Sequence, residues 1–327
     1  MGFQHIIKIG EGKCHRWWHF LCRRNQRMNM GIFEKEITDE KIFEICEKLL
    51  SPEEIVKVTR VCERYGEEEE DVREYDAYKI KIPAGERILK KGSEREINNY
   101  EKYLKGKSFN VPEYYGKYKE GEDNWILIEG IEGEDLRDMT DELAEAAAES
   151  ITEIQNYYWG SQDTDRFDVY MERIGRRYNY IKNEPVVGEA YQVFLERQKT
   201  CPRTMSNGDF LEFNAINKGG KVHIIDWGFG GVMPYALDVA RFIAHGTEDR
   251  ATFPFYMTET QKRLFLNRVY ELLEEKPDYD RFLYDIKLAV LNEYVEFVEA
   301  DEDENGWYID HARSLAKEIM ETQGMKK

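Results

Sequence analysis

The sequence lacks any apolar run close to the roughly 20 residues that a membrane-spanning helix needs, so no membrane partner is expected. It is also poor in cysteine: the five cysteines are an odd number and form no Cys-x-x-Cys pair, so neither a disulfide framework nor a metal site built from them is indicated. We therefore expect reduced thiols in a cytoplasmic protein. The cysteines are Cys14, Cys22, Cys46, Cys62 and Cys201.

Basic residues are scarce relative to acidic ones. The chain has 47 Lys and Arg against 65 Asp and Glu, which gives a formal net charge of -18. Because phosphate backbones are bound by clustered Lys and Arg, a nucleic-acid substrate is not expected. An acidic surface favours cationic partners, and it also simply keeps a protein soluble.

The chain does have the material for a substantial core. Hydrophobic residues make up 41% and aromatic residues 13% of 327 residues, a composition that folds rather than stays disordered. No signal-peptide core is indicated, because charges and tryptophans interrupt residues 15–27. Residues 1–30, basic and rich in tryptophan, are expected to be an extension, or the result of a start codon placed too far upstream.

Residues 205–228 are the most informative stretch. They offer Asp209, then an amide at Asn214, then a turn, then a short apolar strand, residues 222–225, that ends in Asp226. A phosphoryl-transfer centre needs a carboxylate to accept a hydroxyl proton, and oxygen ligands for the magnesium that neutralises nucleotide phosphates. Asp209 suits the first task, and Asn214 with Asp226 suits the second. Taken singly these are also ordinary turn residues, so the interpretation depends on their order.

The order Asn-Gly-Asp-x-x-x-x-Asn followed by Ile-Ile-Asp-Trp-Gly closely resembles the aminoglycoside phosphotransferase and choline kinase family, small-molecule relatives of the protein kinases. The resemblance implies that Asp209 is the catalytic base and that Asn214 and Asp226 bind magnesium. The family usually has His at the position of Asn207, which orients the loop. Asp238 resembles the family acid that supports this loop from behind; the alternative is a solvated acid in a first helical turn.

A strand-like run, residues 86–90, leads into a helix-like run, residues 96–104, and resembles the part of the family that binds nucleotide phosphates. The resemblance assigns Lys90 to the phosphates and Glu96 to holding that lysine. Lys91 is the alternative to Lys90, because neighbours in a strand face opposite sides. The alternative to a nucleotide site is that Lys90 and Glu96 form an exposed ion pair that contributes little to stability.

Two further segments resemble parts of the nucleotide site. Residues 124–129 and the glycine after them resemble the hinge whose backbone hydrogen-bonds the adenine, so the candidates by position are Glu129, Gly130 and Ile131. Residues 63–76 occupy the position of the flap over the nucleotide. Their acids, residues 67–71, are expected to point to solvent.

We predict an α+β, bilobal, protein-kinase-like fold: a small antiparallel β-sheet N-lobe over residues 31–130 and a larger, mostly α-helical C-lobe over residues 131–327. Alternation predicts strands at residues 55–62 and 77–82. Apolar spacing predicts a helix at residues 38–50 with Thr38 as its N-cap. Further helices are expected at residues 141–159, 168–183, 188–200, 234–243, 259–276, 279–300 and 307–322.

The predicted function is transfer of the γ-phosphoryl group of ATP, with Mg²⁺, to a hydroxyl of a small molecule such as an aminoglycoside-like antibiotic, choline or a sugar. Acids and aromatic residues within residues 299–308 are candidates for binding a cationic acceptor, and a solvated linker is the alternative there. A protein kinase is disfavoured because no Ala-Pro-Glu anchor follows Gly228. A catalytically silent nucleotide-binding scaffold stays open because of Asn207 and the acidic flap. The sequence leaves the oligomeric state undetermined.

Overall fold

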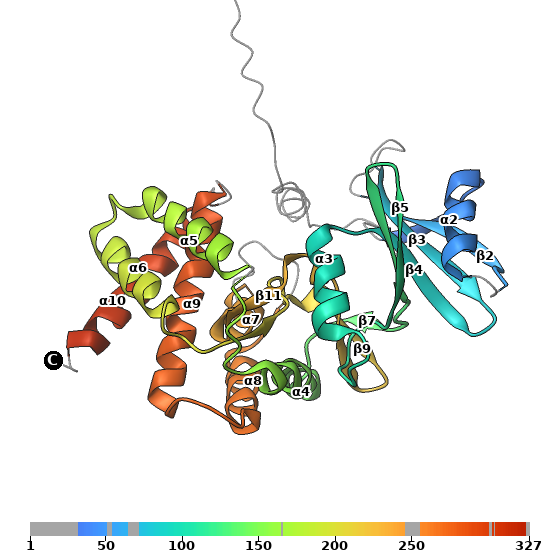
Figure 1. The fold of residues 1–327 in the computed structure, drawn as a ribbon. Helices are drawn as coiled ribbons and strands as arrows, with labels where there is room; N and C mark the ends of the chain where they lie inside the picture. The colour runs from blue at the N-terminus through green and yellow to red at the C-terminus, as the bar shows by residue number, and fades with distance from the viewer. Residues whose placement is uncertain are drawn as a thin grey trace, which may run out of the picture.

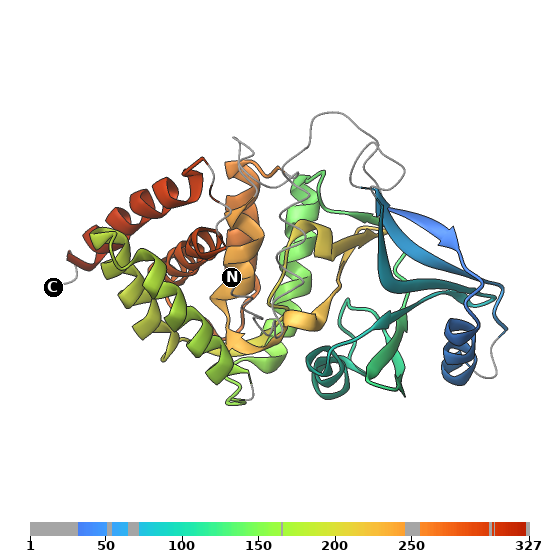
Figure 2. The same ribbon diagram turned by 90° about the horizontal axis from the view of Figure 1, so that it is seen from above.

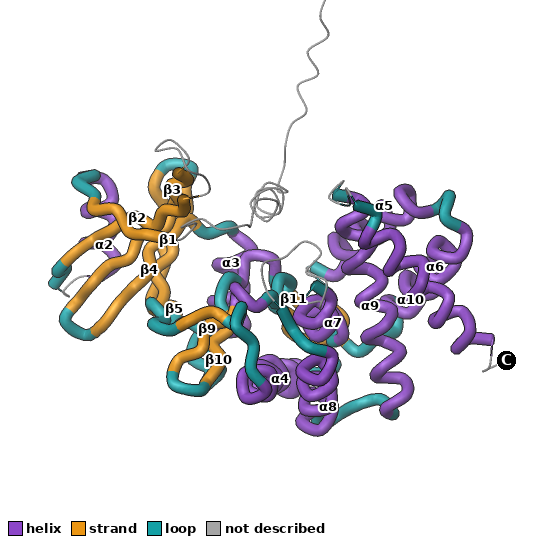
Figure 3. The backbone as a smooth tube through the Cα atoms, turned by 180° about the vertical axis from the view of Figure 1, so that it is seen from behind, coloured by secondary structure: helices purple, strands orange, loops and turns teal. Residues whose placement is uncertain are grey.

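A computed structural model describes residues 32–50, 54–64, 72–164, 166–245, 256–300, 303 and 305–324. A sheet formed early in the chain occupies one half of the molecule, and most helices occupy the other (Figure 1, Figure 3). This is the α+β arrangement that the sequence predicts. The predicted extension, residues 1–30, and the acids of the predicted flap, residues 67–71, lie outside the described residues.

The described strands of the main sheet number six, are all antiparallel, and lie in the order β1-β2-β3-β4-β6-β5. Their bounds are β1 Ile32–Glu36, β2 Lys57–Arg64, β3 Val72–Ile82, β4 Gly85–Lys91, β5 Tyr114–Glu120 and β6 Asp123–Glu129. The prediction was wrong in starting β3 near residue 77. The first part of β3 is rich in polar residues and lacks the alternation of apolar and polar residues from which a strand is predicted. Its backbone pairing with β2 holds it in the sheet.

Helix α2 (Glu40–Leu50) packs on one face of the sheet (Figure 2). Its buried Ile45 belongs to a core cluster with apolar residues of β2, β3, β4 and β6. The apolar spacing therefore predicted this helix correctly, but Thr38 is not its cap. The cap is Asp39, whose carboxylate accepts the N–H of Lys41 at 3.0 Å.

Helix α3 (Glu94–Asn99) and the π-helical turn after it (Tyr100–Leu104) lie between the sheet and the helical half (Figure 1). Ser93 caps the helix by accepting the N–H of Glu96 at 3.1 Å. The apolar residues expected on this helix are Ile97, Tyr100 and Leu104, and all three are buried in the large core of the helical half. This burial holds the segment after β4 against the helical half.

Helices α4 to α10 form the helical half around one hydrophobic core. Their bounds are α4 Asp141–Tyr158, α5 Phe167–Ile181, α6 Pro185–Gln198, α7 Ala236–Ala244, α8 Glu259–Leu272, α9 Tyr279–Glu299 and α10 Trp307–Gly324. All seven predicted helices are present. Helix α8 stops short of residue 276 because Asn156, from α4, accepts the N–H of Glu274 and donates to the carbonyl of Leu272.

Within the described ranges, no helix combines the length and the apolar character that a membrane crossing requires. Cys46, Cys62 and Cys201 are buried free thiols. Burial raises the pKa of each of them, so the thiol form is favoured.

Candidate active site

The stretch with the candidate acids folds around one two-stranded ribbon and one small three-stranded sheet. Strands β8 (Arg203–Ser206) and β11 (Gly231–Pro234) pair with each other, and β9 (Ala215–Lys218) pairs with β10 (Lys221–Ile224). The third strand of the small sheet is β7 (Glu134–Asp135), which lies beside β9. The two glycines between β9 and β10 have φ values of 63° and 85°, which glycine adopts without strain. The chain therefore reverses there, as the sequence predicts.

This reversal returns the chain, just before Asp226, to the catalytic loop, residues 207–214, named for its resemblance to the family's catalytic loop. The N–H of Ile225 donates to the carbonyl of Asn214 at 2.9 Å. Asp226 itself has φ 53° and ψ 75°, in the left-handed region that few residues other than glycine, Asn and Asp adopt. Strain of this kind is typical of functional sites.

The Asp209 carboxylate is buried and held through both of its oxygens. Its Oδ1 accepts from Arg241 Nε at 2.9 Å and Nη2 at 2.7 Å. Its Oδ2 accepts from Asn214 Nδ2 at 3.0 Å, and the same amide nitrogen donates to the Asp209 carbonyl at 2.8 Å. Two of the predicted site residues are thus in direct contact, and the amide oxygen of Asn214 is directed away from that contact.

Asn207, where the family usually has His, connects the loop to the strand that carries the second acid. Its Nδ2 donates to the carbonyls of Ile225 at 3.1 Å and Asp226 at 3.2 Å. Its Oδ1 accepts the N–H of Asp209 at 3.1 Å. The buried amide of Asn207 therefore links Asp209 to Asp226 and orients both. This role needs hydrogen-bond donors and an acceptor, which an amide provides without the ring of a histidine.

Lys90 brings the sheet into the same site. Its Nζ lies 2.8 Å from Glu96 Oε1 and 3.2 Å from Asp226 Oδ1. Burial alone would lower the pKa of Lys90, but the nearby Asp226 and Glu96 carboxylates outweigh it and raise the pKa, so the ammonium stays charged. Lys91 points the other way and pairs with Asp76 and Asp123.

Two residues of α7 support the loop from the helical side. The Asp238 carboxylate, 1% exposed, accepts the N–H groups of Asn207 at 2.7 Å and Gly208 at 2.9 Å. It is therefore not a solvated helical acid. Arg241, which sequence reasoning missed, lies one turn further on the same face of α7 and binds Asp209. Its spacing of three residues from Asp238 was the available signal.

Comparisons with known proteins show the family to which the chain belongs. A family model described as "Phosphotransferase enzyme family" matches residues 72–272, more than half of the chain. The chain belongs to this phosphotransferase family. A search of curated protein sequences gave no match.

Solved structures similar to this phosphotransferase have the same fold. A thermostable mutant of aminoglycoside phosphotransferase APH(4)-Ia, in a ternary complex with AMP-PNP and hygromycin B, is 14% identical with a TM-score of 0.54; the match covers 88% of this chain and 99% of that one. Choline kinase from Cryptosporidium parvum Iowa II is 11% identical with a TM-score of 0.52, covering 88% and 96%. Ethanolamine kinase from Plasmodium vivax is 10% identical with a TM-score of 0.51, covering 86% and 89%. The predicted bilobal, protein-kinase-like fold is confirmed.

Asp226 and Asn214 have the ligand atoms that a nucleotide-bound Mg²⁺ ion needs. The side chain of Asp226 is 40% exposed, and the amide oxygen of Asn214 is not used by the Asp209 contact. No group of three or more His, Cys, Asp or Glu side chains that could hold a metal ion by itself occurs in the part of the chain that the structure describes. Mg²⁺ commonly takes one or two carboxylates and completes its shell with phosphate oxygens and water, so this sparse set suits it.

The three hinge candidates follow directly from the end of β6. The N–H of Glu129 donates to the carbonyl of Glu113 at 2.8 Å, and that of Gly130 donates to the carbonyl of Glu86 at 3.0 Å. A Cβ added to Gly130 would lie 2.9 Å from the Cβ of Glu86, so a larger residue would not fit there without movement. These backbone contacts use the N–H groups of Glu129 and Gly130 but not the N–H group of Ile131.

Proposed function

We propose that this protein transfers the γ-phosphoryl group of ATP to a hydroxyl group of a small molecule. The observation that carries the proposal is the convergence of Lys90, from the sheet, with Asp226, 136 residues later in the chain, at 3.2 Å. Asn207 then connects Asp226 to Asp209. Lys90 as the phosphate-binding cation, Asp226 as the metal-binding acid and Asp209 as the candidate base therefore lie together where the sheet contacts the helical half of the molecule.

Lys90 would bind the α- and β-phosphates in this mechanism, and Glu96, 2.8 Å away and buried, would hold its ammonium in place. Asn214 and Asp226 would hold Mg²⁺, which when bound neutralises charge on the phosphates. Of the hinge candidates, Ile131 would contribute an N–H to the adenine edge, because the N–H groups of Glu129 and Gly130 already have acceptors.

Asp209 would orient the acceptor hydroxyl and take up its proton. Its Oδ1 already accepts two hydrogen bonds from Arg241, whereas Oδ2 accepts one from Asn214, so Oδ2 is the oxygen with capacity for the hydroxyl. The acceptor oxygen forms a bond to the γ-phosphorus as the bond to the β-phosphate oxygen breaks, ADP leaves, and the proton passes to Oδ2. Rate acceleration would come mainly from positioning and charge neutralisation.

The first test replaces the base. Asp209→Asn keeps the size of the side chain and removes its capacity to accept the proton, so turnover should fall by about 10²- to 10⁴-fold while ATP affinity stays near that of the parent. ADP release would be measured over a panel of aminoglycosides, choline, ethanolamine and sugars. Turnover of an accepted substrate near the parent value would remove Asp209 from this role.

The second test concerns the metal. With ATP at about 100 times its dissociation constant, the parent should gain about 2.7 kcal/mol of stability, seen as a Mg²⁺-dependent rise in melting temperature. Asp226→Ala should abolish the Mg²⁺-dependent part of that rise because it removes the exposed carboxylate beside Lys90. An unchanged rise would show that Asp226 does not bind the metal.

A further inference from the structure

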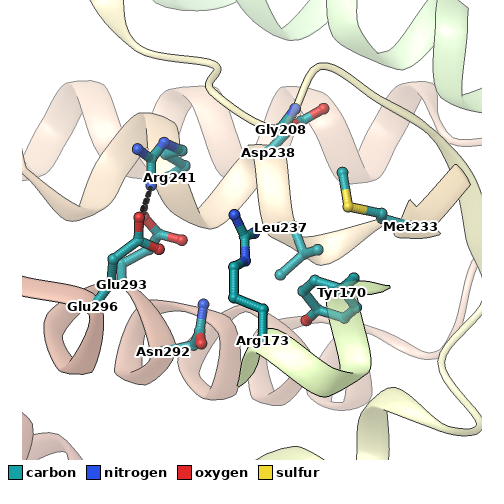
Figure 4. A pocket seen from close by; sticks show the side chains of 10 residues that line it. All are labelled: Tyr170, Arg173, Gly208, Met233, Leu237, Asp238, Arg241, Asn292, Glu293 and Glu296. Carbon is teal, nitrogen blue, oxygen red and sulfur yellow. Dashed lines mark hydrogen bonds and ion pairs between the residues drawn. The ribbon is translucent and has the colours of Figure 1, made fainter. Parts of the chain in front are cut away.

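A small pocket lies on the helical side of the catalytic loop, between α5, α7 and α9 (Figure 4). Gly208, the residue before Asp209, forms part of its wall. Arg241, which binds the Asp209 carboxylate, also lines it. The pocket is small and opens to solvent, so at most one group of a substrate can enter it.

The acids that line this pocket already have partners. Glu293 Oε2 lies 2.6 Å from Arg241 Nη1, and Glu296 Oε2 lies 2.5 Å from Arg177 Nη2. The Asp238 carboxylate accepts two backbone N–H groups of the catalytic loop. Because arginines and N–H groups already satisfy these carboxylates, the pocket offers little to a cationic group.

Arg173 is the exception among the charged residues of the pocket. It extends from α5 into the middle of the pocket (Figure 4), and its Nε is buried without a hydrogen-bond partner. Within the described residues its guanidinium makes no ion pair. Burial, and then the neighbouring Arg177, lower the pKa of Arg173, and the Glu296 carboxylate opposes this shift without forming an ion pair with Arg173 within the described residues.

Asn292, on the floor of the pocket, adds a second donor. Its Oδ1 accepts from Arg177 Nη1 at 3.0 Å and from the Tyr191 hydroxyl at 3.0 Å. The amide nitrogen therefore faces the pocket, as Figure 4 shows. The unpartnered guanidinium of Arg173 and the amide N–H₂ group of Asn292 can both donate hydrogen bonds into the pocket. A carboxylate or a phosphate ester has the oxygen atoms to accept them.

We propose that this pocket binds an anionic group of the acceptor, a carboxylate or a phosphate ester, and that Arg173 is the residue that recognises it. The planar fork of arginine matches either group with two parallel hydrogen bonds. This inference rests on the proposed phosphotransferase function, and it replaces the cationic acceptor that the sequence suggested with a hydroxylated anion.

The experiment compares the parent with Arg173→Leu and with a matched control, Arg176→Leu, which removes an exposed arginine from the same helix. Each protein, loaded with AMP-PNP and Mg²⁺, is titrated with glycerate and gluconate as carboxylates, glucose 6-phosphate as a phosphate ester, inorganic phosphate, and choline and hygromycin B as cations. At least one hydroxylated anion should bind the parent and Arg176→Leu equally. It should bind Arg173→Leu about 10- to 100-fold more weakly, the effect of losing charge-assisted hydrogen bonds.

Arg173→Lys provides a second variant that keeps the charge without the fork, and its affinity should lie between those of the parent and Arg173→Leu. Unchanged stabilisation of Arg173→Leu by AMP-PNP and Mg²⁺ would show that the variant is folded and binds nucleotide. The proposal is wrong if no anion binds the parent, if anions bind Arg173→Leu as tightly, or if choline or hygromycin B binds in place of the anions. The proposed function is tested separately, because loss of Mg²⁺-dependent ATP stabilisation in Asp226→Ala does not depend on any acceptor.

Discussion

Lys90 and Lys91 are neighbours on β4 and carry the same charge, yet they lie on opposite sides of the sheet. Lys90 contacts Glu96 and Asp226, and its side chain is 19% exposed. Lys91 is 38% exposed and makes surface ion pairs. Exposed pairs of this kind contribute little, because water screens the charges and two long side chains lose freedom. For these two residues, the side of the strand determines which lysine faces Asp226.

These neighbours make a matched pair of variants. Lys90→Ala should lower kcat/KM for ATP by about 10- to 100-fold, because a charge-assisted contact to phosphate is lost. Lys91→Ala should leave kcat/KM within about twofold of the parent. Steady-state kinetics with varied ATP checks both, and a larger loss in Lys91→Ala than in Lys90→Ala would reverse the assignment.

Helix α7 acts as the support of the catalytic loop. From one face it supplies Asp238, whose carboxylate binds two loop N–H groups, and Arg241, whose guanidinium binds the Asp209 carboxylate. Gly208 has φ 77°, and a Cβ there would lie 2.5 Å from the carbonyl oxygen of Phe229. The loop can therefore approach the segment after Asp226 closely only because this position is glycine.

The Asp238 carboxyl should make stability depend on pH. Burial raises the pKa of Asp238 to about 6, although its hydrogen bonds with Gly208, Ser206 and Asn207 oppose the shift. Between about pH 6 and the ordinary value near 3.8 the folded state binds a proton that the unfolded state does not. The contribution of Asp238 to the free energy of unfolding should therefore rise as pH falls through this window, by at most about 3 kcal/mol.

Denaturant unfolding of the parent and of Asp238→Asn between pH 4 and pH 7 measures this contribution. Asp238→Asn has no group that titrates at this position, so its stability should lack this rise. The stability of the parent relative to the variant should therefore increase as pH falls through the window, because only the parent can take up the proton. Parallel pH profiles for the two proteins would contradict the assignment of this titration to Asp238.

The whole molecule depends on contacts that join its two halves. Asn99, at the end of α3 and fully buried, donates from Nδ2 to the carbonyl of Trp227 at 2.8 Å. This contact joins the helix that carries Glu96 to the residue after Asp226. It therefore fixes Glu96, the partner of Lys90, relative to Asp226.

Breaking this contact should weaken both folding and nucleotide binding. Asn99→Leu leaves the Trp227 carbonyl without its donor, which should cost about 1–3 kcal/mol of stability and raise KM for ATP. Asn179→Leu, at an exposed position of α5, is the control and should change neither quantity appreciably. Thermal unfolding and steady-state kinetics report the two effects, and a stability loss without any change in KM would limit Asn99 to a structural role.

How far the sequence could predict this site varied from residue to residue. The β9–β10 turn was predictable because its paired glycines favour a reversal in any context. The contact between Asp209 and Asn214 was within reach because five residues separate them. The contact of Arg241 with Asp209 was missed because it joins α7 to the loop across 32 residues. The spacing of Arg241 three residues after Asp238 indicates only that the two share a helix face, not what that face contacts.

The helices, most strands and the order of Asp209, Asn214 and Asp226 could be predicted from the sequence alone, because each of these follows from residues a few positions apart. Packing in three dimensions determines that Lys90 rather than Lys91 faces Asp226, that Asp238 is buried beneath the loop, and that the Nε of Arg173 is buried in a pocket without a hydrogen-bond partner among the described residues. Those outcomes depend on how α5, α7, α9 and the sheet pack together. The free energy of an ion pair or of a buried charge is set by its surroundings in space, which neighbours in the chain do not specify.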